Sequence, residues 1–142
     1  MKKILTFAII LIASLPSFSQ ISVSTQKTIG VIKNGSAEDV VLSISDKTIT
    51  IKYMGTTVQN KWNQDFVRFI GGENELNTLY GALISVIDSD DKNYSLDLTF
   101  GENSILNLKK TKIMGISYVS ISNGITTTRG LNKAQINKLF DK

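Results

Sequence analysis

One segment of the chain, from Glu73 to Asp88, constrains the fold more than any other because its apolar residues follow the period of an α-helix. They recur at intervals of three and four positions, which places them along one stripe of the helix surface. The stripe consists of Leu76, Leu79, Tyr80, Leu83, Ile84 and Ile87. Such a stripe has to be covered by other apolar surface. The sequence therefore predicts a central helix with strands packed around it.

Gly81 lies in the middle of this predicted helix. Glycine in a helix interior costs about 1 kcal/mol relative to alanine, so its presence needs a reason. Either the backbone of a strand packs close to Gly81 or the helix is locally weak, and we expect close packing. If no strand approaches Gly81, a ligand or a partner becomes the better explanation.

The segments around the helix are rich in β-branched residues or alternate between apolar and polar residues, which is typical of strands. The predicted strands are Ile21–Thr25 and Thr28–Lys33 as a first strand or strand pair, then Val40–Ile44, Ile49–Tyr53, Asp65–Ile70, Tyr94–Phe100, Ile105–Lys110, Ile113–Ser122 and Ile125–Arg129. Val40–Ile44 and Ile49–Tyr53 are predicted to pair as an antiparallel hairpin. Asp65–Ile70 and Ile113–Ser122 carry apolar residues on both faces, which predicts strands covered on both sides.

The dipeptide Asn123-Gly124 favours a two-residue hairpin turn with positive φ at both positions. This turn would pair Tyr118–Ser122 with Ile125–Arg129. Its threonine-rich second strand suits the edge of a sheet, where polar side chains can face water.

The chain ends in a short predicted helix from Asn132 to Asp141. Asn132 can cap this helix, and Gln135 can reach back to the cap residue. With the central helix from Glu73 to Asp88, the elements predict an α+β fold built on a curved, antiparallel sheet of about seven or eight strands.

Residues 1–19 have the pattern of a secretory signal peptide. Lys2 and Lys3 precede an apolar run, and small residues follow Pro16. The run is too short to span a bilayer, which needs roughly 20 apolar residues. We therefore expect an exported chain, periplasmic or extracellular, with residues 20–142 forming a single α+β domain and no stable membrane span after cleavage.

The chain contains no histidine and no cysteine. This excludes Ser-His-Asp triads, histidine-ligated zinc, thiol nucleophiles and disulfides. No pair of carboxylates has a spacing that singles it out, so we name no catalytic, cofactor-binding or metal-binding residue and expect a non-enzymatic protein. The net charge of +4 includes Lys2 and Lys3 of the signal, so the exported part is near neutral and nucleic-acid binding is not expected.

Two charged clusters are interpreted as solvated loops. Asp88–Asn93 resembles the start of a calcium loop, but Lys92 stands where an oxygen ligand belongs. Asp88 would lie at the negative end of the helix dipole, which indicates that Lys92 or another cation lies nearby. Lys109–Lys112 is interpreted as a solvated turn between two strands.

Trp62 is the candidate contact residue because large aromatic side chains are enriched at binding surfaces; the alternative is that it folds over the sheet edge as a small satellite core. The first functional hypothesis is therefore a small exported, non-enzymatic module that binds a protein or a cell-envelope component. The alternative is a carrier of a small apolar ligand, held in a cavity between sheet and helix. That cavity would be lined by Leu83, Ile84, Leu96 and Leu98.

Overall fold

The computed structural model describes residues 25–54 and 64–142. The elements follow in the order β1 (Gln26–Asn34), β2 (Ala37–Ser45), β3 (Thr48–Met54), β4 (Gln64–Ile70), α2 (Glu73–Asp88), β5 (Ser95–Phe100), β6 (Ser104–Ile113), β7 (Ile116–Ser122) and α3 (Lys133–Leu139). The predicted α+β class, the central helix and the short C-terminal helix are confirmed. Trp62 and the predicted signal peptide, residues 1–19, lie outside the described residues.

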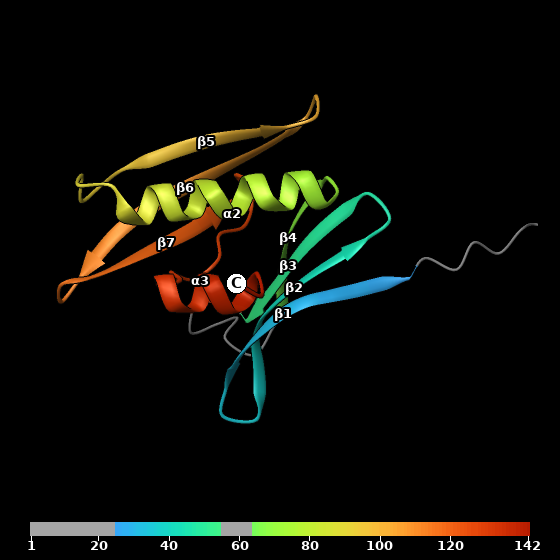
Figure 1. Cartoon of the computed structure of the whole chain (residues 1–142), viewed down its shortest axis with the longest axis horizontal. Coiled ribbons are helices and arrows are strands. Elements are labelled where there is room, and N and C mark those ends of the chain that lie inside the picture. Colours follow the sequence, from blue (N-terminus) through green and yellow to red (C-terminus); the bar gives the residue numbers. More distant parts are fainter. Residues whose placement is uncertain (1–24, 55–63) are drawn as a thin grey trace, which may run out of the picture.

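The strands form two antiparallel sheets (Figure 1). Sheet A has the order β1-β2-β3-β4, and sheet B has the order β5-β6-β7. The predicted hairpin of β2 and β3 is confirmed, with Leu42 opposite Ile51. Helix α2 contacts the three strands of sheet B, and α3 contacts β1 and β2 of sheet A.

The register of sheet A separates two faces because side chains alternate along each strand. One cross-strand row runs from Gly30 through Leu42 and Ile51 to Val67, and its leucine, isoleucine and valine are fully buried. The next row points to the opposite face and consists of Thr28, Ser43, Thr50 and Arg68. The first face is therefore the core side of the sheet, and the second is its outer side.

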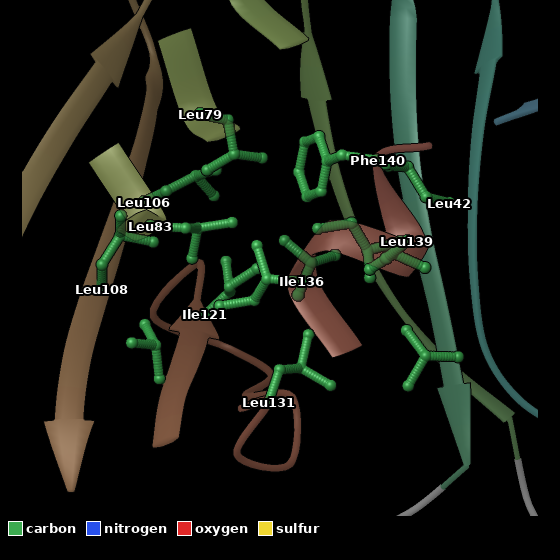
Figure 2. Close-up of a cluster of buried hydrophobic side chains, with 14 of the residues drawn as sticks. Leu42, Leu79, Leu83, Leu106, Leu108, Ile121, Leu131, Ile136, Leu139 and Phe140 are labelled. Atoms are coloured by element: carbon green, nitrogen blue, oxygen red, sulfur yellow. The ribbon is translucent and has the colours of Figure 1, made fainter. Parts of the chain in front are cut away.

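The core lies between the two sheets and the two helices (Figure 2). Leu79 and Leu83 of α2 meet side chains of sheet B and of α3 there. The fully buried members that Figure 2 labels also include Leu106, Leu108, Ile121, Leu131, Ile136 and Leu139. An aromatic contact links the two sheets, because the ring centroids of Phe69 in β4 and Phe100 in β5 lie 4.8 Å apart. Both sheets therefore share one hydrophobic core.

The close packing expected at Gly81 is wrong. A Cβ atom placed on Gly81 would meet nothing within 4 Å beyond the nearby backbone of its own helix. Gly81 is exposed because it lies on the polar side of α2. Asn77 four positions before it and Ser85 four positions after it lie on the same side of the helix. The close approach occurs instead at Gly30 of β1, where an added Cβ would collide with the backbone carbonyl of Leu139.

The prediction that Asp65–Ile70 is covered on both faces is also wrong. This segment is β4, the last strand in the order of sheet A. Val67 and Phe69 are buried, but Phe66 is 39% exposed and Ile70 is 65% exposed. These two apolar residues lie on the outer side of the sheet, which sequence periodicity alone cannot distinguish from a covered face.

The segment Ile113–Ser122 is not one covered strand, because a two-residue turn at Met114 and Gly115 separates β6 from β7. Both turn residues have positive φ, 50° and 83°. The hairpin predicted at Asn123-Gly124 is wrong in its geometry, since only Gly124 of the two has positive φ. The Asn123 Oδ1 atom accepts hydrogen bonds from the N–H groups of Ile125 and Thr126, so the chain turns without a regular second strand.

The segment after this turn joins the two sheets. It forms only isolated bridges to β7, at Thr127 and Leu131. The Thr126 hydroxyl donates to the Phe66 carbonyl of β4 over 3.0 Å. Nη1 of Arg129 lies 2.5 Å from Oδ2 of the buried Asp39 on β2. These contacts hold the C-terminal part of the chain against sheet A.

The capping box of α3 is confirmed. The Asn132 Oδ1 atom accepts from the Gln135 N–H over 2.9 Å, and the Asn132 N–H donates to Gln135 Oε1 over 3.0 Å. Ile136 and Leu139 are fully buried, and the Phe140 ring contacts the Tyr80 ring in a tilted arrangement with centroids 5.5 Å apart. The helix is short, so this packing rather than its own propensity holds it in place.

Candidate functional site

The residues proposed for an apolar cavity are part of the packed core. Leu83 is fully buried, and Ile84, Leu96 and Leu98 pack against the same cluster. The other candidate, Trp62, is not among the described residues, so its exposure stays a prediction. The surface features below are those that the described residues build.

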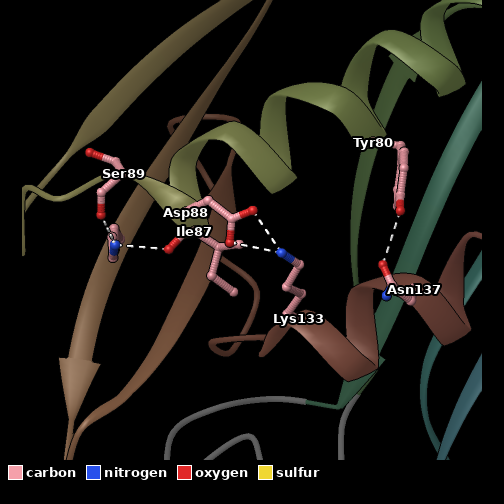
Figure 3. A network of polar contacts seen from close by, with 7 residues as sticks. Tyr80, Ile87, Asp88, Ser89, Lys133 and Asn137 are labelled. Atoms are coloured by element: carbon pink, nitrogen blue, oxygen red, sulfur yellow. Dashed lines mark hydrogen bonds and ion pairs between the residues drawn. The ribbon is translucent and has the colours of Figure 1, made fainter.

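Two lysines contact the C-terminal end of α2 (Figure 3). Lys110 of β6 is 5% exposed, and its Nζ atom donates to the carbonyls of Ile87, over 2.8 Å, and Ser89. The interpretation of Lys109–Lys112 as a solvated turn is therefore wrong, because this segment lies within β6 and Lys110 points inward. A buried ammonium at the negative end of the helix dipole satisfies carbonyls that would otherwise have no partner.

The second lysine bears on the prediction that a cation lies near Asp88. Lys133 of α3 places its Nζ atom 2.7 Å from Asp88 Oδ2, so the nearby cation is confirmed, although it is Lys133 and not Lys92. Figure 3 also shows the Tyr80 hydroxyl beside Asn137, to whose Oδ1 atom it donates over 3.0 Å. These polar contacts fasten α2 to α3 and to sheet B. Their role is structural.

The outer side of sheet A contains a shallow hollow of about 690 Å³, here called the outer hollow. It is lined mainly by polar side chains from all four strands, among them Gln26, Thr28, Glu38, Lys52 and Arg68, together with the apolar Phe66. Three of its four charged groups, Lys52, Glu38 and Arg68, have partners. Lys52 lies 3.4 Å from Glu38, and the Arg68 guanidinium lies 4.6 Å above the Phe66 ring. Internal pairing of this kind leaves less charge for an external ligand.

The turn between β6 and β7 carries the most exposed apolar cluster of the described chain. Ile113 is 55% exposed, Met114 is 99% exposed and Ile116 is 51% exposed. These three residues are called the apolar tip. Figure 1 places the turn at one end of sheet B, at the lower left of the view. Ile113 and Ile116 face each other as the last pair of the ladder, so their side chains lie on the same face.

The backbone of the tip makes its sequence unusual. A two-residue hairpin turn with positive φ at both positions favours Asn-Gly or Asp-Gly, because other side chains crowd the backbone there. Gly115 meets this requirement, but Met114 at φ 50° does not. Met114 is also almost fully exposed, so no packing within the described structure offsets the strain. An apolar side chain is therefore held in water at a position better suited to asparagine.

The segment that contains the tip carries charge of one sign only. Residues 103–140 include six basic residues and no aspartate or glutamate. The basic residues are Lys109, Lys110, Lys112, Arg129, Lys133 and Lys138. On the β6–β7 hairpin itself, Lys109 and Lys112 are exposed while Lys110 is buried. Asp88 lines a surface hollow together with Ile116, and Asp88 is paired with Lys133.

Ionisable groups with shifted pKa values lie outside the tip. Burial raises the pKa of Tyr53 on the core side of sheet A. The backbone N–H of Gly72 lowers the pKa of Glu75, to whose Oε2 atom it donates over 2.7 Å at the start of α2. Within residues 25–54 and 64–142, no group of three or more Asp or Glu side chains could hold a metal ion. No helix in the part of the chain that the structure describes is both long and apolar enough to cross a membrane.

Comparisons of the chain with protein-family models, with curated proteins and with solved structures found no significant match. The sequence does not predict the apolar tip, because methionine is a poor turn residue and the apolar pattern from Ile113 to Ser122 is typical of a strand interior. Two signals were present. Gly115 follows Met114 directly, and the acid-free segment from residue 103 to residue 140 is visible in the sequence.

Proposed function

We propose that this chain is a small exported, non-enzymatic module that binds a protein or a component of the cell envelope through its apolar tip. The proposal rests on Met114, whose side chain is 99% exposed and whose backbone φ is 50°. Backbone strain persists where the surrounding structure or a function requires it. Since nothing in the described structure packs on Met114, a contact outside the chain is the better reason for it.

The neighbours of Met114 support the same proposal. Ile113 and Ile116 extend the apolar surface on the adjoining ladder pair. Single exposed apolar residues are common, but a cluster at one projecting turn is characteristic of interaction sites. The outer hollow is a concave surface on sheet A, and its Lys52, Glu38 and Arg68 side chains already have partners within the chain. The tip is therefore the surface that we assign to binding.

The experiment uses the protein purified after export and measures its binding to the isolated envelope fraction of the producing cells. Met114→Asn removes the apolar side chain and places a favoured residue at the positive-φ position, so the variant stays folded. The matched control is Ile125→Asn, because Ile125 is 91% exposed in a turn beyond the opposite end of β7. We expect Met114→Asn to weaken binding roughly tenfold and Ile125→Asn to leave it unchanged. Equal binding by all three proteins would refute the assignment.

A further inference from the structure

Resting on this proposed function, we propose that the partner of the apolar tip is the surface of a lipid bilayer that carries anionic headgroups. The tip would enter the boundary between headgroups and acyl chains. Lys109 and Lys112 behind it would contact lipid phosphates. Charge, geometry and the small size of the tip each support this partner.

The charged residues of the β6–β7 hairpin are all basic. Among the basic residues between residues 103 and 140, Arg129 is paired with Asp39, Lys133 is paired with Asp88, and Lys110 is bound to carbonyls at the end of α2. Lys109 and Lys112 are exposed, and neither forms an ion pair with a residue in the described ranges. Two free ammonium groups on the strand that leads to an apolar turn complement a negative surface.

The spacing along β6 fits the depth of a membrane interface. A strand rises about 3.3 Å per residue, so Lys112 adjoins Ile113 and Lys109 lies about 13 Å behind it. Apolar groups at a bilayer surface sink roughly 5–10 Å into the headgroup and acyl boundary. Lysine stems can then extend along the apolar surface and keep their charged ends at the headgroups. Lys112 would thus lie at phosphate level when Met114 reaches the acyl chains, and Lys109 would lie farther out, over the headgroups.

Insertion of this turn exposes few unpaired backbone groups to lipid. Ile113 and Ile116 are paired in the ladder, so the hairpin remains hydrogen-bonded up to its last two residues. Backbone groups without partners are costly in hydrocarbon, and a paired hairpin end avoids most of that cost.

A protein partner is less well supported by the shape of the tip. Stable protein interfaces cover about 800 Å² on each partner and involve roughly 20–30 residues a side. The tip offers three apolar side chains on a projecting two-residue turn, flanked by Lys112 and Thr111, which are both exposed. A soft surface that closes around a convex tip suits this arrangement better than a second folded protein.

The test measures cosedimentation of the exported, full-length product with vesicles of phosphatidylcholine alone or with about 30% phosphatidylglycerol. We expect at least tenfold stronger binding to the anionic vesicles, and a large loss when salt is raised from about 0.1 M to about 0.5 M. Met114→Asn should reduce binding roughly tenfold, because it removes the most exposed apolar side chain. Ile125→Asn should bind as the wild type does, which controls for loss of any exposed isoleucine and for contributions from elsewhere in the chain.

A double variant, Lys109→Gln with Lys112→Gln, separates charge from apolar insertion. It should lose the preference for phosphatidylglycerol while its weak binding to phosphatidylcholine remains. Lys110 is left unchanged because it holds the end of α2.

The outcomes distinguish the two proposals. Tip-dependent binding to anionic vesicles supports both. Tip-dependent binding to the envelope fraction without binding to vesicles overturns the lipid partner but leaves the binding module in place. Binding that is the same for wild type, Met114→Asn and Ile125→Asn overturns the role of the tip in either assay.

Discussion

Replacing Gly81 with alanine should stabilise the protein. Gly81 is an interior residue of α2, where glycine is less favourable than alanine by about 0.8–1.0 kcal/mol. The added methyl group would meet nothing within 4 Å beyond the nearby backbone of its own helix. The substitution therefore gains helix propensity without a steric penalty and without new packing. We expect the free energy of unfolding to rise by about 0.5–1 kcal/mol, which corresponds to a rise in Tm of roughly 2–5 °C.

The assay is urea unfolding followed by circular dichroism, with the midpoint and slope compared at constant protein concentration. Gly71→Ala is the matched control because a Cβ atom there would lie 2.6 Å from Cβ of Glu75 in the first turn of the same helix. That variant should be less stable than the wild type. A Gly81→Ala protein that is no more stable than the wild type would refute the reasoning, and it would imply that a contact outside the described residues requires glycine at this position.

Three further substitutions test the packing and the electrostatics. Gly30→Ala should destabilise strongly, by about 1–3 kcal/mol in urea unfolding, because the new Cβ would collide with the Leu139 carbonyl. Lys110→Met should cost about 1–3 kcal/mol in the same assay, because it leaves buried carbonyls at the end of α2 without a donor, and an unchanged midpoint would contradict this role. Glu75 has a folded-state pKa below its ordinary value of 4.5 because it accepts from the Gly72 N–H. Its stabilising contribution should therefore be present above about pH 4.5 and be lost as pH falls through the lowered pKa, so the stability difference between wild type and Glu75→Gln should vanish in acid.

The elements that could be predicted from the sequence are those specified by short-range patterns. The stripe of α2 and the capping box at Asn132 and Gln135 depend on residues within a few positions of each other, and both are confirmed. The β2–β3 hairpin follows for the same reason. Predictions failed where the answer depends on distant segments. Whether Phe66 faces core or water depends on the position of β4 in sheet A, which no local pattern contains.

The candidate site was only partly predictable. Trp62 was selected for its side chain, whereas Met114 stands out through backbone conformation and exposure, which the sequence does not display. Lys110 was misinterpreted because its partners are carbonyls of a helix end more than 20 residues away, and backbone partners leave no signature in composition. The absence of acidic residues from residue 103 to residue 140 was readable, but it acquired meaning only when the hairpin placed two of its lysines behind an apolar turn.

The contact between Gly30 and Leu139 has a consequence for the order in which the molecule can assemble. The first described strand packs against the last helix, so sheet A cannot complete its core side until the C-terminal residues of the chain are present. Contacts between distant segments are also slow to form, because the intervening chain must be ordered before they contribute. A chain that emerges from its N-terminal end would therefore remain incompletely folded until α3 has emerged. Truncation by even a few C-terminal residues should leave the apolar side of sheet A exposed and make the protein prone to aggregation.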